Sequence, residues 1–287
     1  MNLQVSPLTP GFAGEVFDLD LSQPLSKQQV ETIDKAMDHY AVLAFRDQNL
    51  SPEPQLRFAE NFGNLDLGFK KISKSPDRLN HAAVLDISNV DETGKVADRN
   101  HRKIIGNLAN QLWHSDSSFQ TPPARYSMLH AVVLPSDGGE TEFADVRAAY
   151  DALSDAKKRQ LEGLHAQHFA LHSRFLLGDN DYTEEQRQAI PAVAWPLVRT
   201  HPTSGRSLLF IGSHASHVLE LPIAEGRLLL MDLLEHATQP QFIYRHAWKP
   251  GDLVMWDNRS TLHRGRPFDL SARRELRRTT TLETLAE

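Results

Sequence analysis

The sequence predicts one β-barrel or jelly roll with helices packed on its outside. The first observation is the number of short apolar or alternating segments that end at Gly, Pro, Asn or Asp, which is typical of strands joined by turns. The second is that a few segments with helical periodicity are inserted between these strands. The third is that no repeat, low-complexity tract or linker divides the 287 residues, so we expect a single domain over residues 1–287.

Two amphipathic helices are expected in the N-terminal part, with a buried strand between them. Residues 26–40 carry an apolar stripe at helical spacing, and Ser26 is the expected N-cap. The apolar run at 41–46 predicts a buried strand. A second helix is expected to open at Ser51 and to run to Gly63, a suitable residue to follow its C-cap.

A polar and weakly periodic stretch follows, from about residue 65 to residue 110. It contains one short predicted strand, at 82–88. Because long excursions in compact domains are often lids or binding loops, we expect a lid or insert around residues 63–103.

The rest of the chain supplies most of the predicted strands. A helical pattern occupies 146–164, and a clear helix with Pro near its start occupies 222–236. The predicted strands are 124–134, 140–144, 197–200, 207–211, 242–245, 252–256 and 277–281.

Composition excludes several classes of function. A formal net charge of -6 argues against a protein that binds nucleic acid or an anionic membrane through its overall charge. The sequence contains no run of about 20 apolar residues, so it predicts no membrane span. The N-terminus lacks the pattern of a secretory signal, and we therefore expect a cytoplasmic protein. The absence of cysteine leaves histidine and carboxylate to hold any metal.

The motif His114-x-Asp116 is the first candidate metal site. On a helix these side chains would point about 200° apart, whereas on a strand they would share a face. A strand would therefore set an imidazole beside a carboxylate. Such a pair could bind a divalent metal, form a surface ion pair or make a buried hydrogen bond. His263 could complete a facial triad of two histidines and a carboxylate, which leaves three adjacent coordination sites open. Alternatively, His263 packs under a turn.

The stretch 272–281 has the alternation of a strand. One face would carry Arg274, Leu276, Arg278 and Thr280, and the other, solvated face would carry Arg273, Glu275, Arg277 and Thr279. Two inward arginines are costly without anions, and a guanidinium matches a carboxylate in bidentate fashion. They therefore indicate either two bound carboxylates or salt bridges within the protein.

These motifs resemble those of the Fe(II)/2-oxoglutarate dioxygenases of the taurine dioxygenase and TfdA family. The resemblance rests on His114-x-Asp116, Gly139-Glu-Thr141, His263, and Arg274 eleven residues after it. It extends over nearly the whole chain and is strongest toward the branch that acts on aryloxyacetates. The further stretches that carry it are 110–119, 124–129, 174–178, 214–218 and 256–259.

The resemblance implies a fold, a cofactor set and a role for each site residue. The fold would be a double-stranded β-helix, or jelly roll, with flanking helices. His114, Asp116 and His263 would bind Fe(II), and 2-oxoglutarate and O₂ would be co-substrates, with ascorbate sustaining activity. Thr141 and Arg274 would hold the distal carboxylate of 2-oxoglutarate. The implied substrate contacts are Arg278, Asn110, Lys71, Lys95 and Ser117, although Lys71 and Lys95 could equally be solvated surface lysines.

The implied reaction is hydroxylation of an aryloxyacetate, such as 2,4-dichlorophenoxyacetate, at the carbon between the ether oxygen and the carboxylate. The products would be a phenol, glyoxylate, succinate and CO₂, and the partners would be a small carboxylate and a second copy of the chain in a homodimer. A related dioxygenase that acts on a sulfonate, an alkyl sulfate or another small acid would keep every motif. A jelly-roll protein that binds a metal or a sugar without turnover is the alternative from a different class.

Overall fold

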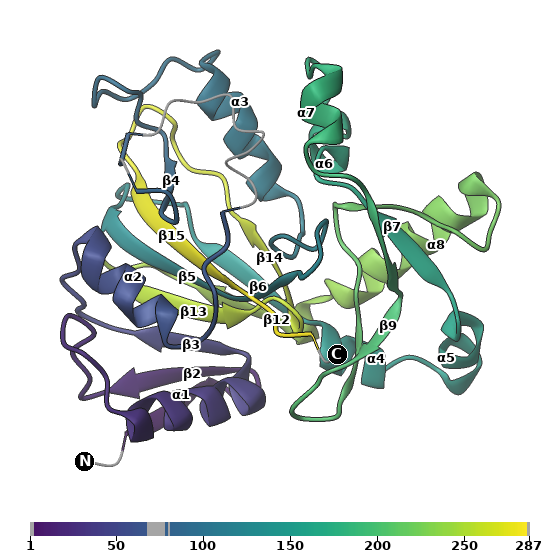
Figure 1. Ribbon diagram of the computed structural model, residues 1–287, viewed down its shortest axis with the longest axis horizontal. Helices are drawn as coiled ribbons and strands as arrows, with labels where there is room; N and C mark the ends of the chain where they lie inside the picture. Colours follow the sequence, from purple (N-terminus) through teal and green to yellow (C-terminus); the bar gives the residue numbers. More distant parts are fainter. Residues whose placement is uncertain (1–2, 68–77, 80, 286–287) are drawn as a thin grey trace.

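The computed structural model describes residues 3–67, 78–79 and 81–285, and this part of the chain is mainly β with helices outside the sheets (Figure 1). The largest sheet has seven strands in the order β1-β2-β3-β13-β5-β15-β4. Their bounds are β1 (Gln4–Thr9), β2 (Ala13–Phe17), β3 (Val42–Phe45), β13 (Leu253–Asp257), β5 (Ala124–Val133), β15 (Glu275–Leu282) and β4 (Leu85–Ser88).

A second sheet faces the middle of the large one. It has three strands in the order β12-β6-β14, with bounds β12 (Ile243–His246), β6 (Thr141–Asp145) and β14 (Thr261–Gly265). Because side chains alternate along a strand, β13 sends Val254 and Trp256 toward this sheet, where they pack with Phe143 of β6. The two sheets therefore enclose an apolar layer.

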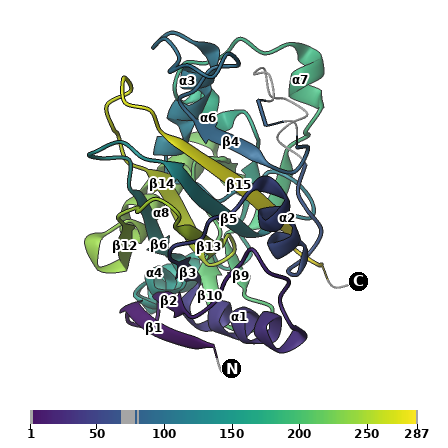
Figure 2. The same cartoon turned by 90° about the vertical axis from the view of Figure 1, so that its left-hand side faces the viewer.

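The opposite face of the large sheet is covered by two helices, α1 (Lys27–Tyr40) and α2 (Pro52–Glu60), which Figures 1 and 2 show on the same side of the sheet. The predicted N-cap is confirmed, since Ser26 and Gln29 form a capping box at the start of α1. The predicted end of α2 at Gly63 is wrong. The helix ends at Glu60, where the Asn61 side chain donates hydrogen bonds to the carbonyls of the last turn.

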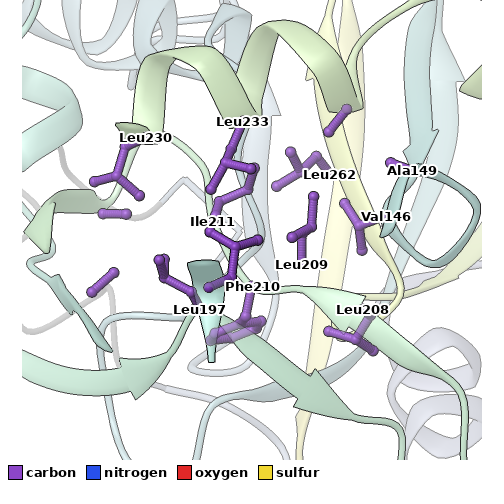
Figure 3. Close-up of a cluster of buried hydrophobic side chains, with 14 of the residues drawn as sticks. Val146, Ala149, Leu197, Leu208, Leu209, Phe210, Ile211, Leu230, Leu233 and Leu262 are labelled. Carbon is purple, nitrogen blue, oxygen red and sulfur yellow. The ribbon is translucent and has the colours of Figure 1, made fainter. Parts of the chain in front are cut away.

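The segment between β6 and β12 forms a further layer beside the second sheet. Figure 3 shows Leu233 of α8 (Ile223–Ala237) pointing toward Ile211, and Leu209 and Leu262 belong to the same buried cluster. The single helical segment expected at 146–164 is instead two short helices, α4 (Val146–Asp151) and α5 (Asp155–Leu161). The break occurs because the Ser154 side chain caps the backbone of α5.

The remaining elements of this segment are short. β11, β7 and β8 form a three-stranded sheet, and β10 and β9 form a two-stranded sheet. The bounds are β7 (His165–His168), α6 (His172–Phe175), α7 (Glu184–Gln188), β8 (Val193–Pro196), β9 (Val198–Thr200), β10 (Ser207–Leu209), β11 (Ala215–Val218) and η3 (Pro240–Phe242). None of the helices described in the structure combines the length and the apolarity needed to cross a membrane.

The stretch expected as a lid contains regular structure that is joined to the main sheet. β4 is an edge strand that pairs with β15, so residues 85–88 belong to the large sheet. The helix α3 (Arg102–Leu108) and the turn η2 (Ala109–Gln111) follow it and were not expected from the sequence. Figure 1 shows α3 above the end of β14.

Candidate active site

Two histidines are brought together by a backbone bridge. The amide of His114 donates to the carbonyl of His263 at 3.0 Å, and the amide of His263 donates to the carbonyl of His114 at 2.8 Å. Their imidazole rings lie 4.1 Å apart between centroids. His114 forms an isolated bridge and Asp116 begins a turn, so the prediction that both lie on one strand is wrong. The turn nevertheless directs the Asp116 carboxylate back toward the two rings.

The three side chains form a compact cluster of potential metal ligands. His114 Nε2 lies 3.8 Å from Asp116 Oδ1, and His263 Nε2 lies 3.7 Å from Asp116 Oδ2. Their donor atoms all lie within 4.8 Å of one another, and all three residues are buried. Among the described residues, this is the group of histidine and acidic side chains that can converge on one ion. Two imidazoles and one carboxylate form a facial triad of the kind that non-haem Fe(II) enzymes use.

Side-chain hydrogen bonds orient two members of this cluster, His114 and Asp116, whereas the buried Nδ1 of His263 has no hydrogen-bond partner among the described residues. His114 Nδ1 donates to the carbonyl of Leu112 at 2.7 Å, so its Nε2 keeps the lone pair that a metal requires. Asp116 Oδ2 accepts from the Ser127 hydroxyl at 2.7 Å. Its backbone amide donates to the Asn258 side chain at 3.1 Å. Ser127 therefore holds the Asp116 carboxylate, and Asn258 holds the backbone of the same residue.

The electrostatics of the cluster favour the protonation states of metal ligands. Burial lowers the pKa of His114 and, together with the neighbouring His114, lowers that of His263 well below the usual range. Burial alone would raise the pKa of the Asp116 carboxyl, but Arg278 and the two histidines hold it well below its ordinary value. Neutral imidazoles beside an ionised carboxylate are the forms that bind a divalent cation.

A cavity opens from this cluster between the two sheets. Its inner wall contains Leu129 and Trp256 of the large sheet and Thr141 of the second sheet. Its remaining lining residues are Ile87, Ser88, Asn89, Ile104, Asn107, Leu108, Asn110, Gln111, His114, His263, Gly265, Arg266, Phe268, Leu270, Arg274 and Arg278. Both predicted inward arginines therefore reach the cavity that His114 and His263 also line.

Arg274 is almost completely enclosed, with 8% of its surface exposed. Its Nη2 donates to the carbonyl of Gly139 at 2.9 Å, while its Nε makes no hydrogen bond within the described part of the chain. Burial lowers the pKa of Arg274 to about 10. A Cβ at Gly139, whose φ is +76°, would lie 2.9 Å from the Arg274 Nε, so glycine is required for this approach. The result is a buried positive charge that faces the cavity and lacks a carboxylate partner in the described residues.

Arg278 contacts a carboxylate of the protein, that of Asp116, whereas its position in the sequence also suggested a bound carboxylate. It lies opposite Leu129 in the pairing of β15 with β5, and its Nη1 donates to Asp116 Oδ1 at 2.5 Å. Its buried Nε makes no hydrogen bond in the described residues. Arg278 can therefore hold the Asp116 carboxylate and still offer donors to a second anion.

The other face of β15 does not fit the prediction of a solvated surface. Glu275 and Thr279 are buried, because α2 covers this side of the strand and the Gln55 side chain donates to the carbonyl of Arg277. Glu275 is paired with Arg78 at 2.6 Å. Sequence alternation separated the two faces correctly but could not show that both would be covered.

The remaining predicted substrate residues divide into three groups. Asn110 lines the cavity. The Ser117 hydroxyl donates to Asp66, and Ser117 is not among the lining residues, so its contact with substrate stays a prediction. Lys95 is exposed in a turn closed by Asp91 and does not line the cavity, in agreement with the surface alternative. Lys71 lies outside the described residues.

The histidines outside the cluster lie in separate environments. His201 Nε2 contacts Asp257 Oδ2 at 2.9 Å, and His168 Nδ1 contacts the Ser118 hydroxyl at 3.1 Å. His214 lies with its ring 6.2 Å from that of His114, at an angle of 87°. The sequence alone could not separate these side chains from ligands, because they are as buried as the ligands are.

Several residues that support the cluster were not identified from the sequence. Asn258 accepts from the Trp256 indole at 3.0 Å and donates to Ser127 at 3.0 Å, which places it between the strand β13 and the Asp116 carboxylate. In the sequence, the stretch 256–259 stands out only through the family resemblance. The helix α3, which supplies Ile104 and Leu108 to the cavity, spans only seven residues, so its periodic signal is too short to stand out in a polar region.

Two facing sheets with a His-Asp-His cluster and two arginines at one cavity define a non-haem metal oxygenase site. Residues 4–280 match the family described as "Taurine catabolism dioxygenase TauD, TfdA family". The chain belongs to this family of dioxygenases.

Curated relatives cover almost the full chain. It is 61% identical over 283 residues to the alpha-ketoglutarate-dependent 2,4-dichlorophenoxyacetate dioxygenase of Cupriavidus pinatubonensis, with 99% of each chain covered. It is 36% identical to the (S)-phenoxypropionate/alpha-ketoglutarate-dioxygenase of Sphingobium herbicidovorans, with 94% of this chain and 91% of the relative covered. Among solved structures, AAD-2 in complex with Mn(II) and N-oxalylglycine superposes with a TM-score of 0.95 at 45% identity, with 99% of each chain covered.

Proposed function

We propose that this protein is an Fe(II)- and 2-oxoglutarate-dependent dioxygenase that hydroxylates aryloxyacetates such as 2,4-dichlorophenoxyacetate. Hydroxylation occurs at the carbon between the ether oxygen and the carboxylate. The resulting hemiacetal breaks its bond to the ether oxygen and gives a phenol and glyoxylate, while 2-oxoglutarate becomes succinate and CO₂. One oxygen atom of O₂ enters succinate and the other enters the hydroxylated carbon, so the reaction is balanced.

The observation that carries this proposal is the full-length similarity to a 2,4-dichlorophenoxyacetate dioxygenase, at 61% identity. The cavity supports it independently, because two arginines in one cavity suit two carboxylates. An aryloxyacetate and 2-oxoglutarate together supply a carboxylate for each.

His114, Asp116 and His263 are the proposed iron ligands. Their fit rests on the convergence of three donor atoms within 4.8 Å and on the hydrogen bond that leaves His114 Nε2 free. Bound iron supplies the oxidising chemistry, and the protein supplies position and protection from side reactions. Ser127 and Asn258 orient the carboxylate ligand, which fixes where the ion would lie relative to the cavity.

Arg274 and Thr141 are the proposed site for the distal carboxylate of 2-oxoglutarate. Both side chains line the cavity, and both are buried. An anion there would pair the guanidinium whose burial has no compensating charge in the described residues. The site therefore favours a 2-oxo acid with a second carboxylate over one without it.

Arg278 is proposed to hold the substrate carboxylate through the donors that Asp116 leaves available. Asn110 lies at the same cavity and is proposed as a further substrate contact. Because Arg278 also binds Asp116, the substrate carboxylate would lie close to the iron ligands. That position would direct the adjacent carbon toward the metal site.

We also infer that the two facing sheets are the halves of a double-stranded β-helix. The inward packing of Val254 and Trp256 against Phe143 supports this assignment. A homodimer, a cytoplasmic location and a lid within 63–103 remain predictions from the sequence and its family resemblance.

The proposed activity is tested by assaying product from a panel of acids with Fe(II), 2-oxoglutarate and ascorbate. We expect a phenol and an equal amount of succinate from 2,4-dichlorophenoxyacetate and phenoxyacetate. A neutral phenoxy alcohol of equal size should react poorly, since Arg278 would stay unpaired. Substrate-dependent succinate from taurine or an alkyl sulfate, without phenol from any aryloxyacetate, would reassign the substrate and keep the dioxygenase class. Binding of the metal without any turnover would support the non-enzymatic alternative.

A further inference from the structure

The structure assigns Trp248 as a positioning residue that directs the Thr141 hydroxyl at the distal carboxylate of 2-oxoglutarate, an inference that rests on the proposed function. The Trp248 indole N–H donates to Thr141 Oγ1 at 3.1 Å. A hydroxyl that accepts this bond keeps its own proton for another acceptor. Since Thr141 lines the cavity, that proton can be donated to an anion there.

The direction of this hydrogen bond matters because a threonine hydroxyl can rotate. An indole N–H can only donate, so it presents Thr141 with a donor and never with an acceptor. Without Trp248, the hydroxyl would have to find its orientation when the anion binds. A fixed donor next to Arg274 gives the carboxylate one hydroxyl and one guanidinium without that loss of rotational freedom.

Trp248 is itself held in place by a chain of buried and half-buried side chains. Its ring packs edge-on against His246, with centroids 4.6 Å apart at 76°. His246 is opposite Thr141 in the pairing of β12 with β6. Trp248 follows His246 by two residues, and its indole contacts Thr141 on the paired strand β6. The position of Trp248 thus depends on a histidine that does not touch the cavity.

The His246 ring is fixed at both nitrogens. Its Nε2 donates to Asp252 Oδ2 at 3.0 Å, and its Nδ1 accepts from the Tyr244 hydroxyl at 2.9 Å. Burial raises the pKa of Tyr244 to about 12, which keeps the phenol protonated as that bond requires. Arg46 donates to the same Asp252 oxygen at 2.6 Å and balances its charge. Tyr244, His246 and Asp252 therefore form a rigid support for the indole.

The test removes the indole N–H and keeps an aromatic ring, in Trp248→Phe. Binding is measured without turnover, by calorimetric titration of the Mn(II)-loaded protein with 2-oxoglutarate and, separately, with 2-oxopentanoate. Both compounds carry the same 2-oxo acid head, but only 2-oxoglutarate has a distal carboxylate. We expect Trp248→Phe to weaken 2-oxoglutarate binding about 3- to 10-fold, the loss of roughly one hydrogen bond. The affinities for 2-oxopentanoate and for Mn(II) should stay within about twofold of the wild type, since neither ligand reaches the Thr141 hydroxyl.

Two further variants separate positioning from a general structural effect. Thr141→Val removes the hydroxyl and keeps the side-chain shape, and Trp248→Phe in that background should cause no additional loss. Trp195→Phe is the matched control, because it also removes a hydrogen bond donated by an indole N–H. In this case the acceptor is the carbonyl of Ser118, at 2.8 Å. It should leave 2-oxoglutarate affinity unchanged.

The outcomes are distinct. Equal weakening of both 2-oxo acids, equal losses in Trp248→Phe and Trp195→Phe, or additive losses with Thr141→Val would overturn the role of Trp248. If Thr141→Val loses affinity for 2-oxoglutarate but Trp248→Phe does not, only this inference fails. If the wild type binds both 2-oxo acids equally, the proposed 2-oxoglutarate site itself fails.

Discussion

The metal cluster and the arginine region share one cavity, but they differ in how their charges are satisfied. Asp116 is surrounded by Arg278, two imidazoles and the Ser127 hydroxyl, so its charge is balanced within the protein. Arg274 donates to a glycine carbonyl and has no carboxylate partner in the described chain. In the metal cluster, which we call the complete region, the charge of Asp116 has partners within the protein. In the arginine region, which we call the incomplete region, the charge of Arg274 has no carboxylate partner among the described residues. Arg278 belongs to both.

The largest expected effect comes from removing a ligand of the complete region. His263→Ala should abolish measurable succinate formation and strongly reduce bound Fe(II), because two ligands cannot enclose the ion. Metal content and succinate are measured on the same preparation, and circular dichroism checks the fold. His165→Ala is a suitable control, since His165 lies in an exposed pair with Glu220. Full activity of His263→Ala with iron still bound would rule out the proposed triad.

The next effect concerns the incomplete region. Arg274→Ala should cost about 2–5 kcal/mol of 2-oxoglutarate binding, or roughly 30- to several thousand-fold in affinity, because a carboxylate would be buried without a partner. Arg274→Lys should recover only part of the loss, since an ammonium cannot make the fork contact. The KM for the 2-oxo acid is measured in both variants. An unchanged KM in Arg274→Ala would contradict the assignment.

Arg278 tests whether the two regions are coupled. Arg278→Ala should raise the KM for an aryloxyacetate by an amount equivalent to about 2 kcal/mol or more, and should affect the KM for the 2-oxo acid much less. Because Arg278 also donates to Asp116, we expect a measurable loss of Fe(II) affinity. Titration with Fe(II) under anaerobic conditions measures this second effect. A change in the substrate KM with iron affinity intact would show that the contact with Asp116 is not important for the metal.

The smallest expected effect is on the free energy of unfolding, which a substitution of Arg274 should raise. The pKa of Arg274 lies below its ordinary value of 12.5, so near neutral pH the charged side chain destabilises the ligand-free protein in full. Arg274→Met should therefore raise the free energy of unfolding by about 1–3 kcal/mol, a rise of roughly 2–6 °C in Tm, while weakening 2-oxoglutarate binding as much as Arg274→Ala does.

Arg245→Met provides the comparison for that measurement, because Arg245 is half-exposed and paired with Glu140. It should give no comparable gain. The wild type should be stabilised by added 2-oxoglutarate and Mn(II), and Arg274→Met should not respond to the 2-oxo acid. A loss of stability in Arg274→Met would mean that packing of the arginine stem outweighs its buried charge.

The sequence predicted those parts of the molecule that depend on local pattern. The alternation of Arg274, Leu276 and Arg278 placed both arginines in one cavity, and Ser26 as the expected N-cap placed the start of α1. These features follow from the periods of a strand and a helix, which residues a few positions apart determine.

The parts that could not be predicted depend on contacts between distant segments. The contact of Arg278 with Asp116 joins residues 162 positions apart, and no local pattern indicates it. The hydrogen bond from Ser117 to Asp66 is of the same kind, since it joins residues 51 positions apart. The helix α3 is short and contains Gly106, so Ile104 and Leu108 form an apolar pair too brief to mark a helix in a polar stretch.

The place of β15, between β5 and the edge strand β4, also governs when the cavity can form. This last strand in chain order lies between β5 and β4, and β4 is nearly two hundred positions earlier in the sequence. During synthesis, His114 and Asp116 emerge long before Arg274 and Arg278, so a nascent chain can present part of a metal site without its anion site. Pairings of such high sequence separation form late in folding. Binding of 2-oxoglutarate therefore requires that the β15 segment has taken its place beside β5, because a chain without that segment lacks Arg274.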